Sequence, residues 1–166
     1  MNKNAGIQQI FLFVVLLVGL AIVGIIGSHI YEVTKDQLLN NPVIAGSPQV
    51  NETFAKWDYT AASLDMVFLV VFAGLTLSVL ILSYVTDLPP IFFIAYLILL
   101  IGAVLVSIFL TYTYEQFSGI AEFVNTTATF PKQNQIMSNL PFITLVIGAI
   151  SAIILFVRMK GGQNEY

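Results

Sequence analysis

Four long runs of apolar residues, interrupted by few polar side chains, dominate the pattern of this chain. They cover residues 10–30, 66–84, 91–111 and 142–157. A hydrocarbon core of roughly 30 Å requires about 20 helical residues, each rising ~1.5 Å, so each run is long enough, or nearly so, to cross a bilayer. The pattern predicts an all-α, polytopic membrane protein whose four transmembrane helices form an antiparallel bundle.

The polar segments between the runs set the expected organisation. We expect one integral membrane domain over residues 1–166, with spans at about 7–30, 64–85, 91–112 and 140–158 and extramembrane loops at 31–63 and 113–139. Apolar residues keep a helical spacing past the first and third spans. The helices of these two spans should therefore extend beyond the bilayer, to about residue 39 and to residues 125–129.

Helix breakers and capping residues mark the connections. Pro42 and Pro48 delimit a loop. Asn51 and Asn139 are suited to cap the helices that follow them, because a side-chain oxygen can accept from a first-turn amide. The short connection at residues 86–90 ends in two prolines, and proline is tolerated in a first helical turn. This connection predicts a tight antiparallel hairpin of spans 2 and 3.

The first run invites comparison with a signal peptide. A cleaved signal has an apolar region of only about 7–15 residues and a small-residue cleavage site. Here the run is longer, and it ends in Gly27, Ser28 and His29, which form a poor cleavage site. We interpret it as a retained first span.

Composition narrows the class of protein. The chain is 58% hydrophobic and only 9% charged, which excludes a soluble globular domain and a disordered chain. Its net charge is -3 with six basic residues, so we expect no nucleic-acid partner. It contains no cysteine, which excludes disulfides, thiol catalysis and cysteine-ligated metals.

Charge and aromatic residues suggest an orientation. Lys3, Arg158 and Lys160 lie close to span ends on the side of the termini, where the positive-inside bias acts. We therefore expect both termini on the cytoplasmic side. Aromatic residues near the span ends are expected to anchor the interfaces, the outer one through Tyr31, Trp57, Tyr59, Tyr112 and Tyr114 and the inner one through Tyr84.

Each long loop also contains an Asn-x-Thr triplet, at Asn51 and at Asn125. Glycosylation would place both loops outside, in agreement with the charges. Such triplets also arise by chance, and both asparagines suit helix ends. The sequence leaves the two interpretations open.

Few residues in the spans could carry chemistry. Asp65 lies about one turn into span 2. It is either a wetted carboxylate stabilised by the dipole of its own helix or a proton- or cation-binding group that faces the bundle interior. His29 has no second histidine or carboxylate cluster to form a metal site. Asp87 is a loop residue or a cap for span 3. No nucleophile and base are paired in the spans, so we expect no enzyme activity, catalytic residue, cofactor or metal.

Small residues recur four positions apart, once in each span. The pairs are Gly24 and Ser28, Gly74 and Ser78, Ala103 and Ser107, and Gly148 and Ala152. Small side chains let helix backbones approach closely, which drives association where the hydrophobic effect cannot. The pairs predict tight packing, either within one chain or between copies.

Three functions are compatible with this pattern. The first is a non-enzymatic structural or assembly protein that packs through its small residues and contacts partners through its protruding loops. Partners would be the lipid bilayer, further copies, or other membrane or capsid-type proteins, in a virion membrane or a membrane-bound complex. The second is an oligomeric channel or holin-like pore, in which serine and threonine side chains would line the pore and Asp65 or Asp87 from several copies would form a ring. The third is a small transporter subunit.

Overall fold

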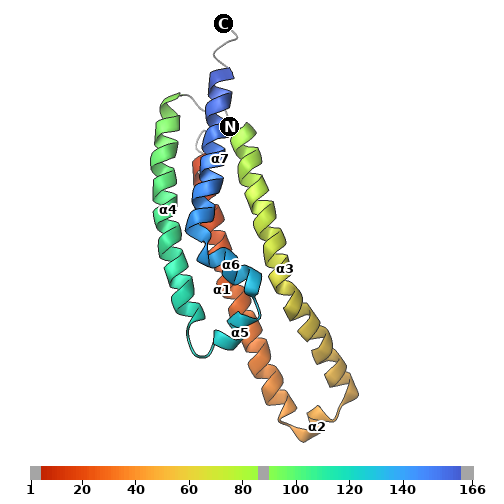
Figure 1. Cartoon of the computed structure of the whole chain (residues 1–166). Helices are drawn as coiled ribbons and strands as arrows, with labels where there is room; N and C mark the ends of the chain where they lie inside the picture. The colour runs from red at the N-terminus through yellow and green to blue at the C-terminus, as the bar shows by residue number, and fades with distance from the viewer. Residues whose placement is uncertain (1–4, 86–89, 162–166) are drawn as a thin grey trace.

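The computed structural model describes residues 5–85 and 90–161, and every regular element within these ranges is an α-helix. Four of the described helices are long and three are short, arranged as in Figure 1. The described helices are α1 (Ala5–Leu39), α2 (Pro42–Ala45), α3 (Pro48–Val85), α4 (Pro90–Ser118), α5 (Val124–Ala128), α6 (Pro131–Ser138) and α7 (Leu140–Gly161). The predicted all-α class is confirmed.

The four long helices, α1, α3, α4 and α7, are long and apolar enough to cross a membrane by length and composition. This confirms the prediction of four such segments. The turn that contains Asp87, and Lys3 near the N-terminus, lie outside the described residues. The helix of the third span begins at Pro90, in agreement with the expected place of this proline in a first turn.

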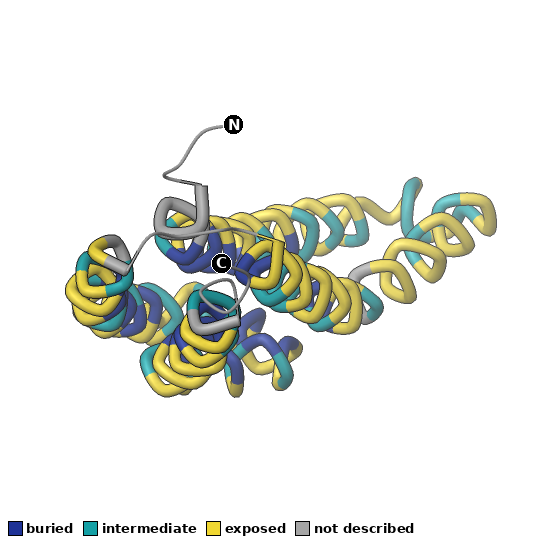
Figure 2. Tube along the Cα trace, turned by 90° about the horizontal axis from the view of Figure 1, so that it is seen from above, coloured by how far each residue is buried: buried dark blue, intermediate teal, exposed yellow. Residues whose placement is uncertain are grey.

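Helices α1 and α7 are the more buried pair of the bundle, although they contact each other much less than they contact α3 and α4. Helix α3 contacts both members of this pair, and so does α4, so that α3 and α4 lie on opposite sides of the bundle (Figure 2). The prediction that spans 2 and 3 form a tight hairpin is therefore wrong. A short connection limits the distance between two helix ends, but the apolar faces along the helices decide which helices pack together.

Burial distinguishes α1 and α7 from α3 and α4. In the most apolar stretch of each helix, 39% of the residues are buried in α1 and in α7, compared with 17% in α3 and 22% in α4. Along α1 the buried side chains recur at helical spacing, as at Val14, Leu17, Ala21 and Ile25. The outward faces are apolar as well, and helices that are apolar all round are typical of membrane spans.

The helix of the first span continues to Leu39, as predicted, and the hairpin beyond it closes through α2. Asn41 caps α2 by accepting a hydrogen bond from the Val43 N–H at 3.1 Å. Helix α3 then begins at Pro48, so the helix of the second span also extends far beyond residue 64. Residues 31–63, expected to be an extramembrane connection with helix to about residue 39 and again after Asn51, are mostly two long helical arms.

The two predicted asparagine caps are not formed. Asn51 lies inside α3, three residues after Pro48, and its side-chain amide donates to the Ala45 carbonyl at 3.1 Å. Asn139 does precede α7 directly, but its side-chain amide donates back to the Gln135 carbonyl at 2.8 Å. In both places the side-chain amide donates to a carbonyl of the preceding segment.

The expected extension of the third span to residues 125–129 is wrong, because α4 ends at Ser118. The chain turns at Gly119, and the Phe123 ring then stacks on Phe117 with 4.6 Å between the ring centroids. The edge of this cluster also meets His29, at 4.9 Å from Phe123. Of the apolar residues that suggested a continuing helix, Phe117 packs on Phe123 as the chain turns back, whereas Ile120 and Val124 are exposed. Helices α5 and α6 then pack against the bundle (Figure 1).

Candidate functional site

A carboxylate in the middle of α3 holds the N-terminal end of α6. The Asp65 side chain is buried, and its two oxygens accept the backbone N–H groups of Lys132 at 3.1 Å and Gln133 at 2.8 Å. The first N–H groups of a helix have no intrahelical partner and carry a partial positive charge, so a carboxylate is stabilised there. Asp65 thereby ties the returning segment, residues 119–139, to α3.

This arrangement differs from what the sequence suggested for Asp65. Because α3 begins at Pro48, Asp65 is far from the N-terminus of its own helix. The dipole that it meets belongs to α6, which the polar run after Pro131 had not revealed. Its interior position agrees with the second interpretation made from the sequence, whereas a role in binding protons or cations stays a prediction.

Gln133 extends this polar contact across the bundle. Its side chain is 2% exposed, and its amide donates to the Ala21 carbonyl of α1 and to the Tyr114 hydroxyl of α4, each at 3.2 Å. The Tyr114 hydroxyl in turn donates to the Asn134 side-chain oxygen. Buried polar groups that are all paired fix one arrangement of the helices that supply them. The cluster of Asp65, Gln133, Tyr114 and Asn134, here called the interior polar cluster, joins α1, α3, α4 and α6.

Sequence reasoning missed Gln133 and misplaced Tyr114. Gln133 stood in a short polar run that resembled a surface turn. Tyr114 was expected at the outer interface, but its side chain is 1% exposed. The spacing of Tyr114 from the buried Ser107 and Thr111, at seven and three residues, places all three on the inner face of α4. That shared face is the signal that could have located it.

The other predicted aromatic anchors lie on the surface. Trp57, Tyr59, Tyr84 and Tyr112 are exposed, and Tyr31 is half-buried. The Arg158 guanidinium lies over the Tyr84 ring, 5.3 Å from its centroid, and also donates to the Tyr84 carbonyl. These positions are compatible with interface anchoring.

The small-residue pairs fall into two groups. Ser28, Ala103, Ser107, Gly148 and Ala152 are buried, and Gly24 is half-buried. A Cβ atom on Gly148 would lie only 2.0 Å from Leu100 Cδ1 of α4, so α4 and α7 approach closely there. Gly74 and Ser78 are exposed instead, and a Cβ atom on Gly74 would meet nothing within 4 Å. Three pairs therefore lie toward the interior of one chain, and the pair on α3 faces outward.

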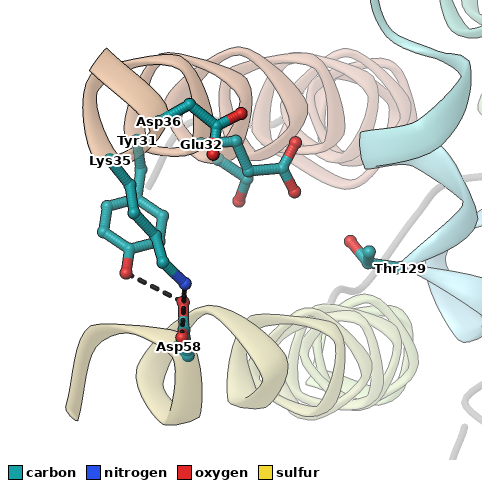
Figure 3. A pocket seen from close by; sticks show the side chains of 7 residues that line it. Tyr31, Glu32, Lys35, Asp36, Asp58 and Thr129 are labelled. Atoms are coloured by element: carbon teal, nitrogen blue, oxygen red, sulfur yellow. Dashed lines mark hydrogen bonds and ion pairs between the residues drawn. The ribbon is translucent and has the colours of Figure 1, made fainter. Parts of the chain in front are cut away.

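A polar cavity of about 410 Å³ opens between α1 and α3, beside the turn that precedes α6 (Figure 3). Asp58 of α3 accepts hydrogen bonds from Lys35 Nζ, at 2.8 and 2.6 Å, and from the Tyr31 hydroxyl at 2.8 Å. The cavity is lined by Ser28, Tyr31, Glu32, Lys35, Asp36, Asp58 and Thr129. Three carboxylates and one ammonium group therefore share this space.

The charges in the cavity affect two pKa values outside the predicted spans. The hydrogen bonds from Lys35 and then from Tyr31 hold the pKa of Asp58 below its usual value of 3.8. Burial, followed by the hydrogen bond to Asp58, raises the pKa of Tyr31 to about 12. At neutral pH Tyr31 is a neutral donor to an ionised Asp58. The bridge between the two arms is therefore a charged one.

The remaining candidate residues are not brought together. His29 contacts the Phe123 ring, and Asn51 and Asn125 are both exposed on different elements. Among residues 5–85 and 90–161, no group of three or more histidine, aspartate or glutamate side chains is placed to hold a metal ion.

Compared with protein-family models, with curated protein sequences and with solved structures, the chain matches none of them.

Proposed function

We propose that the chain is an integral membrane structural or assembly protein, in which four antiparallel spans carry a protruding hairpin and pack against further copies through α3. The observation that carries this proposal is the low burial of α3 and α4 within one chain. Only 17% of the most apolar stretch of α3 and 22% of that of α4 is buried. Apolar surface of this extent requires lipid or another protein around it.

The outward face of α3 supports contact between copies. Gly74 and Ser78 share this face with Leu77 and Ile81, which are 58% and 60% exposed. Helix association in a membrane relies on close approach at small residues, because lipid tails are as apolar as the helices. With open space above Gly74, a second α3 can approach there without displacing any side chain of this chain.

The proposed bilayer placement uses the same four helices. We place the crossing parts at about residues 7–30, 64–85, 91–112 and 140–158, with both termini on the cytoplasmic side. The arms of α1 and α3 then stand in the outer aqueous phase and are available to partners. A virion membrane stays a prediction from the sequence alone.

Cysteine cross-linking tests the α3 contact directly, because the chain contains no native cysteine. Gly74→Cys and Ser78→Cys should form disulfide-linked dimers in native membranes under mild oxidant. Ile98→Cys, at an exposed position of α4, is the matched control and should form few. Equal cross-linking at all three positions, or none at positions 74 and 78, contradicts the proposal. Extraction of membranes with alkaline carbonate separately tests whether the chain is integral.

The pore hypothesis lacks a comparable observation. Asp65 lies inside one chain and binds α6, so it is not available for a ring of carboxylates between copies. The serine and threonine side chains in the spans mostly bond within the chain, as Thr111 does to the Met137 carbonyl at 3.1 Å. The structural role is therefore the function that we propose.

A further inference from the structure

Three adjoining hollows follow one side of α1 and together form a groove between α1 and α3, which we call the α1–α3 groove. The α1 residues that line them run from Leu20 to Gly24, from Val23 to Tyr31 and from Ser28 to Asp36. Successive hollows share lining residues, Val23 and Gly24 in one case and Ser28 and Tyr31 in the other. The groove is apolar at its inner end and charged at its outer end.

We propose that this groove binds one membrane lipid whose head group carries an ammonium group. The hydrocarbon chain would lie in the apolar part, a glycerol-backbone oxygen would face Ser28, and the head group would occupy the polar cavity. This inference rests on the membrane placement proposed above.

The apolar part has the shape that an acyl chain requires. Its two hollows measure about 220 and 270 Å³, and side chains such as Val23, Leu64 and Val67 form their walls. Gly27 leaves the space open, because a Cβ atom there would meet nothing within 4 Å. A flexible hydrocarbon chain can fill a narrow hollow of this kind and cover the apolar surface.

The length of the apolar part matches one leaflet. From Leu20 to Ser28 the helix rises by eight residues, about 12 Å at ~1.5 Å per residue. Half of a hydrocarbon core of roughly 30 Å is about 15 Å. The change from apolar to charged lining at Ser28 therefore falls where a lipid changes from chain to head group.

Ser28 provides an independent sign of a ligand. Its side chain is 6% exposed, and its hydroxyl has no hydrogen-bond partner among the described residues. Ser28 lines both the second hollow and the polar cavity. A buried hydroxyl without a partner is costly, and an oxygen of the lipid backbone would satisfy it.

The charges of the polar cavity select the head group. Glu32, Asp36 and Asp58 face one basic residue, Lys35, so the lining is acidic overall. The Glu32 carboxylate is held by the Thr126 hydroxyl at 2.5 Å, and Asp58 is held by Lys35 and Tyr31. An ammonium-bearing zwitterionic head group complements this lining, with its phosphate toward Lys35. A purely anionic head group is repelled.

Trp57 gives the experiment its probe, because it is the only tryptophan and it lines the groove. The protein is reconstituted in nanodiscs of phosphatidylglycerol with a low mole fraction of phosphatidylethanolamine brominated on its acyl chains. A second set reverses the two lipids, so that the brominated lipid is the phosphatidylglycerol. Because bromine quenches on contact, we expect at least twofold stronger quenching of Trp57 by the brominated phosphatidylethanolamine.

Variants separate the groove from the bulk bilayer. Gly27→Leu should fill the groove and reduce quenching to the same low level in both sets. Ala149→Leu is the matched control, because Ala149 is an exposed small residue of α7 that lines none of the three hollows, and it should leave quenching unchanged. Ser28→Ala should weaken retention of phosphatidylethanolamine roughly fivefold in native mass spectrometry.

Two outcomes would overturn the proposal. One is quenching that does not depend on the head group, and the other is equal quenching in the native protein and in Gly27→Leu with native helix content by circular dichroism. Failure of the membrane placement itself is distinguishable, because the protein would then not enter nanodiscs at all and no variant would be quenched.

Discussion

Residues 31–63 and residues 113–139 connect the long helices at the same end of the molecule, yet they are held in opposite ways (Figure 1). None of the described side chains in residues 31–63 is buried. In residues 113–139 the buried side chains include Tyr114, Thr126, Phe130, Gln133 and Met137. The first segment forms two helical arms that stand away from the bundle, and the second returns to it.

The difference lies in where the polar contacts are made. The arms are joined by exposed contacts, chiefly the Lys35–Asp58 ion pair at 2.6 Å, and exposed pairs of this kind stabilise a protein by only about 0–1 kcal/mol. The returning segment is held by the interior polar cluster, whose groups would be left unpaired in a dry interior if it opened. The returning segment should therefore be rigid. The arms should be the more adaptable of the two segments.

The largest effect is expected for Asp65→Ala. The change leaves the N–H groups of Lys132 and Gln133 without their acceptor, and hydrogen bonds to charged groups contribute about 1.5–3 kcal/mol each. We expect the free energy of unfolding in detergent, measured by titration with SDS, to fall by about 3 kcal/mol. Hydrogen exchange should rise in residues 119–139 and stay unchanged in residues 31–63.

Asp58→Ala is the control for this change, because it removes an exposed carboxylate from the arms. It should lower the free energy of unfolding by less than about 1 kcal/mol. Equal losses in the two variants would show that the buried carboxylate holds the returning segment no more firmly than the surface pair holds the arms.

A smaller effect is expected for Tyr114→Phe. Its hydroxyl accepts from Gln133 and donates to Asn134, so its removal leaves the buried Gln133 amide and the half-buried Asn134 amide with one partner fewer each. We expect a loss of about 1–2 kcal/mol in the same titration. Tyr112→Phe lies two residues away on the exposed face of α4 and should change the free energy little. A loss as large in Tyr112→Phe would contradict the assignment of Tyr114 to the interior polar cluster.

The four long helices and their apolar class could be predicted because each is determined by local sequence. A run such as residues 142–157 is apolar and ends close to Gly161. Its helix can therefore be predicted without knowing which other helices pack against it. The protruding part of α1 could be predicted for the same reason, because the helical spacing of apolar residues continues without a helix breaker to Leu39.

What the sequence did not reveal depends on contacts between distant residues. Asp65 and Gln133 are 68 residues apart, and the sequence around either residue does not indicate that the two will be in contact. The packing of α3 and α4 on opposite sides of the α1–α7 pair likewise depends on the relative burial of all four helices, not on the short connection at 86–90. The turn of the chain at Gly119 follows from Phe117 meeting Phe123, a contact that helical spacing alone cannot distinguish from a continuing helix.

Thr126→Val tests a contact between the two segments themselves. The Thr126 side chain is fully buried, and its hydroxyl donates to Glu32 at the base of the first arm, at 2.5 Å. Valine has nearly the same shape, so the change removes mainly this hydrogen bond, for an expected loss of about 1 kcal/mol. Hydrogen exchange should rise in α5. Thr34→Val, which removes an exposed hydroxyl bonded within its own helix, should have no such effect, and a similar rise in both variants would contradict the proposed tie.

The smallest effect concerns the ion pair of the arms and its dependence on pH. Because the pKa of Asp58 is lowered in the folded protein, the pair stabilises the protein above the usual value of 3.8 and this contribution is lost as the pH falls through the lowered pKa. The amount should be well under 1 kcal/mol, because the Asp58 side chain is 49% exposed. Lys35→Met removes the pairing cation, so its free energy of unfolding should be lower than that of the native protein at about pH 6, and the difference should disappear as the pH falls below the lowered pKa of Asp58. Carbon-13 NMR of the Asp58 carboxyl should show its pKa returning toward 3.8 in this variant. An unchanged Asp58 pKa in Lys35→Met would mean that the arms are held together by their apolar contacts, such as Tyr31 stacked on Trp57 at 5.8 Å, and not by the ion pair.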